Sequence, residues 1–133
     1  MATETMPTGR GFLQVRVSTA GDALPVKNAT VTITEQGKDG AAGKVLYSTL
    51  TDRSGLTPLF SLPAPPASVG EQPGLGVPYT EYRVEVSADR FISQIFEGVP
   101  VFSGVTTVQP ATLTPAGVSQ PAPERFPPYS STL

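Results

Sequence analysis

The chain contains no cysteine and no histidine in its 133 residues. Without cysteine it can form no disulfide, no thiolate nucleophile and no zinc–thiolate site, so its stability must come from packing. Without histidine it lacks the commonest general base and the commonest transition-metal ligand. These absences argue against an enzyme or a metalloprotein, and we expect a non-catalytic chain that needs no cofactor.

Charged residues are also scarce, at 15% of the chain against roughly 25% in average soluble domains. The net charge is −2 and no run of Lys or Arg occurs, so the electrostatic footprint of a nucleic-acid binder is missing. The apolar runs fall far short of the ~20 residues that cross a bilayer, so we expect no membrane span. Residues 1–10 have neither the basic start nor the apolar stretch of a signal peptide, which predicts synthesis in the cytoplasm.

Strict alternation of apolar and polar residues is the clearest pattern that the chain does have, and it is typical of half-buried strands. Three segments show it best: Leu13, Val15 and Val17; Ala29, Val31 and Ile33, with Thr30, Thr32 and Thr34 outward; and Tyr82, Val84 and Val86, with Glu81, Arg83 and Glu85 outward. We expect four more strands at about 44–51, 59–62, 91–99 and 105–113. No segment sustains helical spacing, so the sequence predicts an all-β, seven-stranded sandwich.

The connections and ends divide the chain. Residues 35–43 are polar and glycine-rich, which predicts a hairpin loop, and residues 63–78 hold five prolines, which predicts an extended crossover between sheets. We expect an extended N-terminal arm at 1–10, the sandwich at 11–114 and a Pro-rich C-terminal tail at 115–133.

The order of these motifs resembles the carboxypeptidase regulatory-like domains, a family with the transthyretin-like, or prealbumin-like, Greek-key β-sandwich. The resemblance lies in the first strand from Gly11 to Val17, in Pro25-Val26 before the Ala29–Ile33 strand, in the T-D-x-x-G turn at 51–55, and in the strand that begins at Tyr82. Where the family continues into a Gly-Tyr pair, this chain has Arg90-Phe91. The resemblance implies an accessory or structural module, similar to stand-alone bacterial members in spore-formers, with delivery to a spore or cell surface after synthesis.

The carboxylates offer no convincing catalytic pattern. Asp52 stands in the T-D-x-x-G turn, where capping backbone N–H groups is its expected role. Glu81 and Glu85 are four residues apart on one strand, about 13 Å, which is too far for either arrangement of a glycoside hydrolase. Tyr129-Ser130-Ser131 is loosely similar to the tail of hydroxyisourate hydrolase, but that activity depends on histidines. A weak calcium site built from converging loops stays open as an alternative.

Interaction residues are the better candidates. Phe126, Tyr129 and Leu133 stand isolated in the Pro-rich tail, from which they could be laid into a neighbour's groove, and Tyr79 is an aromatic candidate for stacking on sugar. We therefore expect a structural or assembly module that self-associates, as a homo-oligomer or filament, or docks to a cell-surface or cell-wall protein through strand edges and tails. The alternative is a module that binds cell-wall glycan.

Overall fold

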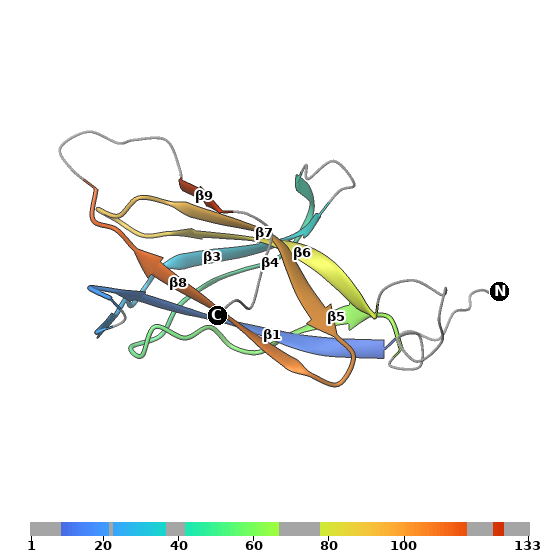
Figure 1. Cartoon of the computed structure of the whole chain (residues 1–133). Coiled ribbons are helices and arrows are strands. Elements are labelled where there is room, and N and C mark those ends of the chain that lie inside the picture. The colour runs from blue at the N-terminus through green and yellow to red at the C-terminus, as the bar shows by residue number, and fades with distance from the viewer. Residues whose placement is uncertain (1–8, 22, 37–41, 67–77, 117–123, 127–133) are drawn as a thin grey trace.

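A computed structural model describes residues 9–21, 23–36, 42–66, 78–116 and 124–126; for residues 42 and 124–126 it describes the backbone alone. Across these ranges the fold is all-β and contains no helix. The strands form two sheets packed face to face, shown in Figure 1. The described part of the chain therefore holds no helix with the length and hydrophobicity that a membrane crossing requires.

The first sheet, sheet A, is built around one long strand. This central strand is β1 (Gly9–Thr19), and its neighbours are β2 (Leu24–Pro25), β5 (Phe60–Ala64) and β8 (Thr106–Leu113). β2 and β5 pair antiparallel with β1, at different heights along the same edge, whereas β8 runs parallel to β1 on the other side. Sheet A is consequently narrow, with β1 shielded on both sides.

The second sheet, sheet B, has five strands in the order β4-β3-β6-β7-β9. Their bounds are β3 (Thr30–Gln36), β4 (Ala42–Leu50), β6 (Tyr79–Ser87), β7 (Gln94–Phe102) and β9 (Glu124–Phe126). All neighbours pair antiparallel except β9, which runs parallel to β7. β4 and β9 are therefore the outermost strands of this sheet.

The core lies between the sheets and is made by the inward sides of the alternating strands. Leu13, Val15, Val17, Val31, Ile33, Val84 and Val86 are fully buried, which confirms the inward faces predicted from the alternation of β1, β3 and β6. Complete burial of a Val or Leu side chain contributes roughly 1.5–3 kcal/mol. Since the chain has no cysteine, this packing is the main source of its stability.

Several predicted boundaries need correction. The structure has more strands than the seven expected, because β2 and β9 are short strands that the alternation does not mark. The strand predicted at 91–99 begins three residues later, at Gln94, because Arg90 has a positive φ of 71° and the Phe91 N–H closes a turn on the Ala88 carbonyl. The tip of the predicted 35–43 loop and most of the predicted crossover lie outside the described residues.

The threonine row of β3 is only partly as predicted. Thr30 and Thr32 are half-exposed, but Thr34, expected outward, is 6% exposed. Thr34 pairs with Val45 on β4 and with Arg83 on β6, and these longer cross-strand neighbours flank it on both sides. The outward row is therefore interrupted where the β3–β4 ladder shifts register.

Candidate functional site

The predicted interaction residues do not form one site. Tyr79 begins β6 and is half-buried, with its ring against that of Phe102 on β7 at a centroid distance of 5.4 Å. Phe126 ends β9 and pairs with Phe96, six residues earlier on β7 and so roughly 20 Å from Phe102. Tyr79 and Phe126 therefore belong to different ends of sheet B, while Tyr129 and Leu133 lie outside the described residues.

The Asp52 carboxylate caps backbone N–H groups of its own turn. Its Oδ1 accepts the Ser54 N–H at 2.9 Å and the Leu56 N–H at 3.0 Å, and Gly55 completes the turn with a φ of +79°. Since a side chain at Gly55 would meet the Val17 carbonyl oxygen at 2.3 Å, both the conformation and the close approach require glycine. The T-D-x-x-G motif thus fixes a turn beside β1.

The carboxylates of β6 and β7 lie on the outer face of sheet B. Glu81 and Glu85 are exposed and alternate with buried residues of β6, and Glu97 forms an ion pair with Arg83 at 3.2 Å. No group of three or more His, Cys, Asp or Glu side chains comes together among the described residues. The carboxylates are spread over a surface and do not converge.

Tyr82 is the one titratable group with a clearly shifted pKa among the residues described. Burial raises the pKa of its phenol from 10.0 to about 12, with a smaller lowering by Arg10 and a raising by Glu35. Its hydroxyl donates to the Pro63 carbonyl oxygen at 2.6 Å. Tyr82 thereby links β6 of one sheet to β5 of the other and is a structural tyrosine.

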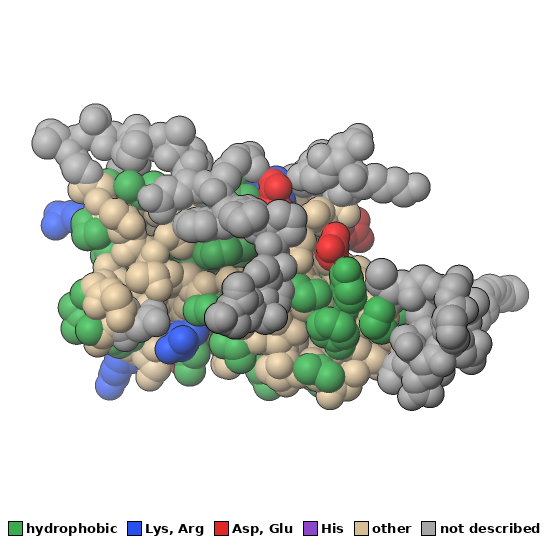
Figure 2. Space-filling model, viewed as in Figure 1, with side chains coloured by type: hydrophobic (Ala, Val, Ile, Leu, Met, Phe, Trp, Pro, Cys, Tyr) green, Lys and Arg blue, Asp and Glu red, His purple; other side chains and the backbone are tan. Residues whose placement is uncertain are grey.

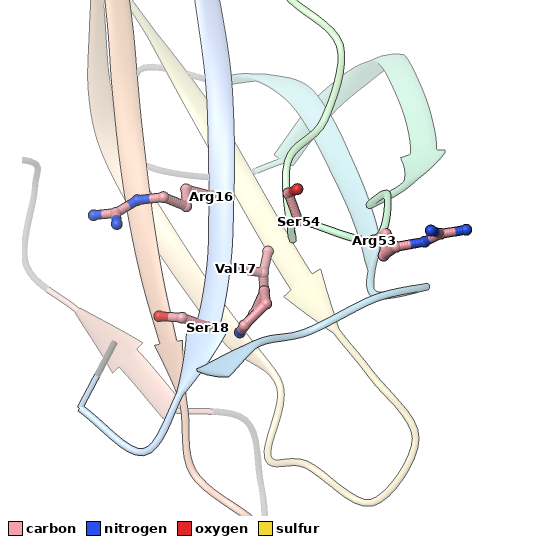
Figure 3. Close-up of a pocket in the computed structure, with 6 residues that line it drawn as sticks. Arg16, Val17, Ser18, Arg53 and Ser54 are labelled. Atoms are coloured by element: carbon pink, nitrogen blue, oxygen red, sulfur yellow. The ribbon is translucent and has the colours of Figure 1, made fainter. Parts of the chain in front are cut away.

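A surface hollow of about 250 Å³ lies beside β1 and is lined by Arg16, Val17, Ser18, Pro25, Arg53 and Ser54. Two arginines at one hollow would suit an anion if their guanidinium groups converged. Figure 3 shows the opposite, because Arg16 and Arg53 point away from each other on either side of the hollow. This arrangement is a groove at the sheet margin and not a binding cradle.

The hydrogen bonds of β1 show which residues of β5 and β8 direct their backbone N–H and C=O groups away from β1, toward the edges of sheet A. The Phe12 N–H donates to the Val105 carbonyl, toward β8, whereas Val15 and Val17 bond toward the opposite edge. Along a strand, successive residues direct their backbone N–H and C=O groups to opposite edges, and this holds for β8 as it does for β1. On β8, Thr106, Val108, Pro110 and Thr112 therefore direct their backbone groups away from β1, and on β5 Ser61 and Pro63 do so.

Both edges of sheet A carry obstacles to pairing with another strand. Each places a proline, which has no N–H, at an outward position: Pro110 on β8 and Pro63 on β5. Two outward carbonyls on each edge are also occupied by side-chain donors. Gln94 donates to Thr112 at 2.6 Å and Gln109 to Pro110 at 2.8 Å on β8; Tyr82 donates to Pro63 at 2.6 Å and Tyr47 to Ser61 at 3.1 Å on β5. These are the means by which natural proteins block edge pairing.

The β4 edge of sheet B is different. It contains no proline, and Val45, Tyr47 and Leu50 are 57%, 38% and 55% exposed along it. Its first half shifts register twice against β3, whereas its second half pairs regularly from Tyr47 to Leu50. Bulges and a lysine, Lys44, are edge protections too, so β4 is open over a short length only.

The outer face of sheet A carries arginines and exposed apolar side chains. We call it the basic face, and it consists of Arg10, Phe12, Gln14 and Arg16 of β1, Ser61 and Pro63 of β5, and Thr106, Val108 and Pro110 of β8. Phe12 is 36% and Val108 44% exposed. Figure 2 shows most of the visible Lys and Arg side chains along the left of the view and the visible Asp and Glu side chains at the upper right. The strands β1, β5 and β8 contain arginines and no carboxylate, whereas β6 and β7 contain three glutamates and one arginine.

No protein-family model and no curated protein sequence matches the chain. Among solved structures it is similar to catechol 1,2-dioxygenase from Pseudomonas arvilla C-1, with 14% identity and a TM-score of 0.53 over 84% of this chain and 54% of that one. The same enzyme from Acinetobacter sp. ADP1 gives 15% identity and a TM-score of 0.50 over 90% and 59%. Transthyretin from Sparus aurata gives 19% identity and a TM-score of 0.35 over 56% and 53%.

The likeness to the two dioxygenases defines a class of fold and nothing finer. The chain spans between about half and three fifths of the length of these proteins. At identities this low, the likeness to the two dioxygenases shows the fold alone, an all-β sandwich of two sheets. Neither an activity nor a family follows from them.

Proposed function

We propose that this chain is a non-catalytic structural module that assembles with further copies of itself through its surfaces. The observation that carries this proposal is that large apolar side chains are exposed on the strands: Phe12 and Val108 on the basic face, and Val45 and Leu50 on β4. Phe12 and Val108 lie together on one surface, and exposed apolar side chains that gather in this way are a feature of interaction sites. Because prolines obstruct both edges of sheet A, the proposal rests on the faces, the β4 edge and the C-terminal tail.

The test is the mass of the chain in solution. Sedimentation velocity over a hundredfold range of concentration should show a weight-average mass that rises above that of the 13.9 kDa monomer. A chain that stays monomeric over the whole range contradicts the proposal.

The contribution of the tail can be tested separately. Truncation after Ala116 removes β9 but keeps the hydrogen bonds from Ile92 N–H to the Thr114 carbonyl and from Ala116 N–H to the Arg90 carbonyl. We expect the truncated chain to fold and to assemble less, since Phe126, Tyr129 and Leu133 are lost. If the weight-average mass depends on concentration as it does for the full chain, the tail is excluded as an anchor, and the faces and the β4 edge remain as the assembling surfaces.

We further propose that the sandwich is of the carboxypeptidase regulatory-like, transthyretin-like kind. The Asp52 turn, with its two N–H donors and its positive-φ glycine, supports this. An experimental structure of the chain, superposed on members of that family, would test it. A different strand connectivity in those members would exclude the assignment.

A second candidate function is binding of cell-wall glycan. The observation that favours it is the ring pair of Tyr79 and Phe102, both half-exposed, because aromatic rings at a surface can stack on sugars. Binding to peptidoglycan that is lost in Tyr79→Ala and kept in Tyr47→Ala would support this function. Absence of saturable binding to peptidoglycan and to a glycan array would exclude it.

A further inference from the structure

The outer faces of the two sheets carry opposite charge. On the basic face of sheet A, Arg10 and Arg16 contribute two positive charges, and no carboxylate of the described strands shares that face. On sheet B we call the outward charged side chains of β6 and β7 the acidic face: Glu81, Arg83, Glu85 and Glu97. Over β6 and β7, three carboxylates against one guanidinium give a net charge of −2. Over the strands counted, the two faces therefore carry charges of opposite sign.

The charges of the basic face are available to a partner. Arg10 bonds to Ser61, with Nε to Oγ at 2.7 Å, but no ion pair joins Arg10 or Arg16 to a carboxylate within the ranges that the structure describes. On the acidic face Arg83 is already paired with Glu97, whereas Glu81 and Glu85 stand exposed. The unneutralised charges of one face thus fit those of the other.

The apolar side chains of the basic face lie among its charges. Gln14 is opposite Val108 and Arg16 opposite Pro110 in the parallel ladder, so Phe12 and Val108 are diagonal neighbours. Such a pair has side chains within reach of each other. A partner that covers this face would bury Phe12 and Val108 while the arginines approach its carboxylates.

From this complementarity, and resting on the self-assembly proposed above, we propose that the basic face of one copy docks on the acidic face of the next. The two faces lie on opposite sides of the sandwich, so the contact is heterologous: each copy keeps one face unused, and assembly continues head to tail. The prolines at both edges of sheet A agree with this, because a face contact needs no free backbone groups.

The size of the face predicts a weak contact. Eight residues of a strand extend about 26 Å and three strands about 14 Å, a footprint of roughly 370 Å². Stable complexes commonly bury about 800 Å² on each partner. We therefore expect association that grows with concentration and that weakens when salt screens the charges, for which the Debye length falls from about 10 Å at 0.1 M to 3 Å at 1 M.

Two charge reversals on opposite faces test the proposal. Arg16→Glu replaces one of the two arginines of the basic face with a carboxylate and leaves the acidic face intact. Glu85→Arg replaces a carboxylate of the acidic face with a guanidinium and leaves the basic face intact. Each variant alone should associate about tenfold more weakly than the unaltered chain. Lys27→Glu and Asp89→Arg make the same charge changes at exposed turn positions outside both faces and should leave association unchanged.

Mixing the two variants gives the decisive result. Glu85→Arg still has an unaltered basic face and Arg16→Glu an unaltered acidic face, so an equimolar mixture should regain at least this native contact and associate more strongly than either variant alone. Sedimentation velocity measures this, with circular dichroism to show that each variant is folded. Val108→Glu, which places a carboxylate on the basic face without touching an arginine, should match Arg16→Glu both alone and in the mixture.

The outcomes separate this inference from the proposed function. If the unaltered chain stays monomeric, both fail. If it assembles while Arg16→Glu and Glu85→Arg assemble equally well, or if the mixture associates no more than either variant alone, the face-to-face contact is excluded and self-assembly stands by another surface. A contact with twofold symmetry, such as β4 against β4, would give no recovery on mixing.

Discussion

The hydroxyl of Tyr82 should stabilise the fold at neutral pH and destabilise it in alkali. It donates a 2.6 Å hydrogen bond to the Pro63 carbonyl, and its residue is 3% exposed. Tyr82→Phe keeps the ring and removes only this bond. Because Pro63 is exposed, water can replace the lost donor, and we expect a cost of about 1 kcal/mol at pH 7.

The raised pKa sets the direction of the pH dependence. In the folded chain the pKa of Tyr82 is about 12, above the value of 10.0 for an unperturbed tyrosine. The neutral phenol is thus favoured by folding, so its contribution is fully present below pH 10 and is lost as the pH rises toward 12. Two pKa units correspond to at most about 2.7 kcal/mol, which exceeds the hydrogen bond that Tyr82→Phe removes.

The two proteins should therefore exchange their order of stability. Urea unfolding at pH 7, 9, 10, 11 and 12 should show the unaltered chain more stable at pH 7 and Tyr82→Phe more stable above about pH 11. Subtracting the unfolding free energy of Tyr82→Phe from that of the unaltered chain at each pH removes the contribution of the other titrating groups, which both proteins share. Tyr79→Phe serves as the matched tyrosine control. A constant difference from pH 7 to pH 12 would refute the assigned burial of the phenol.

Three further substitutions test local features, each by urea unfolding. Asp52→Ala removes the acceptor of two N–H groups in an exposed turn and should cost about 1 kcal/mol; a neutral result would mean that water caps the turn equally well. Thr51→Val removes a buried hydroxyl that accepts from the Ala29 N–H and donates to a carbonyl, so we expect a loss of about 2 kcal/mol, more than for Asp52→Ala. Gly11→Ala would place a Cβ 2.1 Å from the Phe102 carbonyl oxygen and should cost more than about 2 kcal/mol; a smaller loss would show that β1 can move away from β7.

The part of the fold that alternation encodes could be predicted from the sequence. Leu13, Val31 and Val84 are buried as their strand parity requires, because a strand packed on one side places every second residue inward. Strand ends were less well predicted. Phe91 has the residue type of a strand but sits beside Arg90 at positive φ, and a left-handed arginine is not visible in a hydrophobic pattern.

The candidate surfaces could not be predicted in the same way, because they depend on register between distant segments. The sequence singles out Tyr79 as a candidate for stacking on sugar, but it does not show that its ring pairs with that of Phe102, 23 residues later in the chain. Arg10 and Arg16 belong to a shared face only because β1 lies between β5 and β8. Alternation shows that a residue points outward and does not show which residues of other strands point the same way.

The prolines show how a single residue type acquires a structural meaning from its position. In the sequence, Pro63 and Pro110 are strand breakers, and each stands inside a segment that the structure nevertheless makes a strand. Both are tolerated because their missing N–H faces away from β1, where no ladder bond is lost. The same placement obstructs strand pairing along both proline-bearing edges of sheet A, so we expect sheet A to bind through the side chains of its outer face, where the arginines and the exposed Phe12 and Val108 lie.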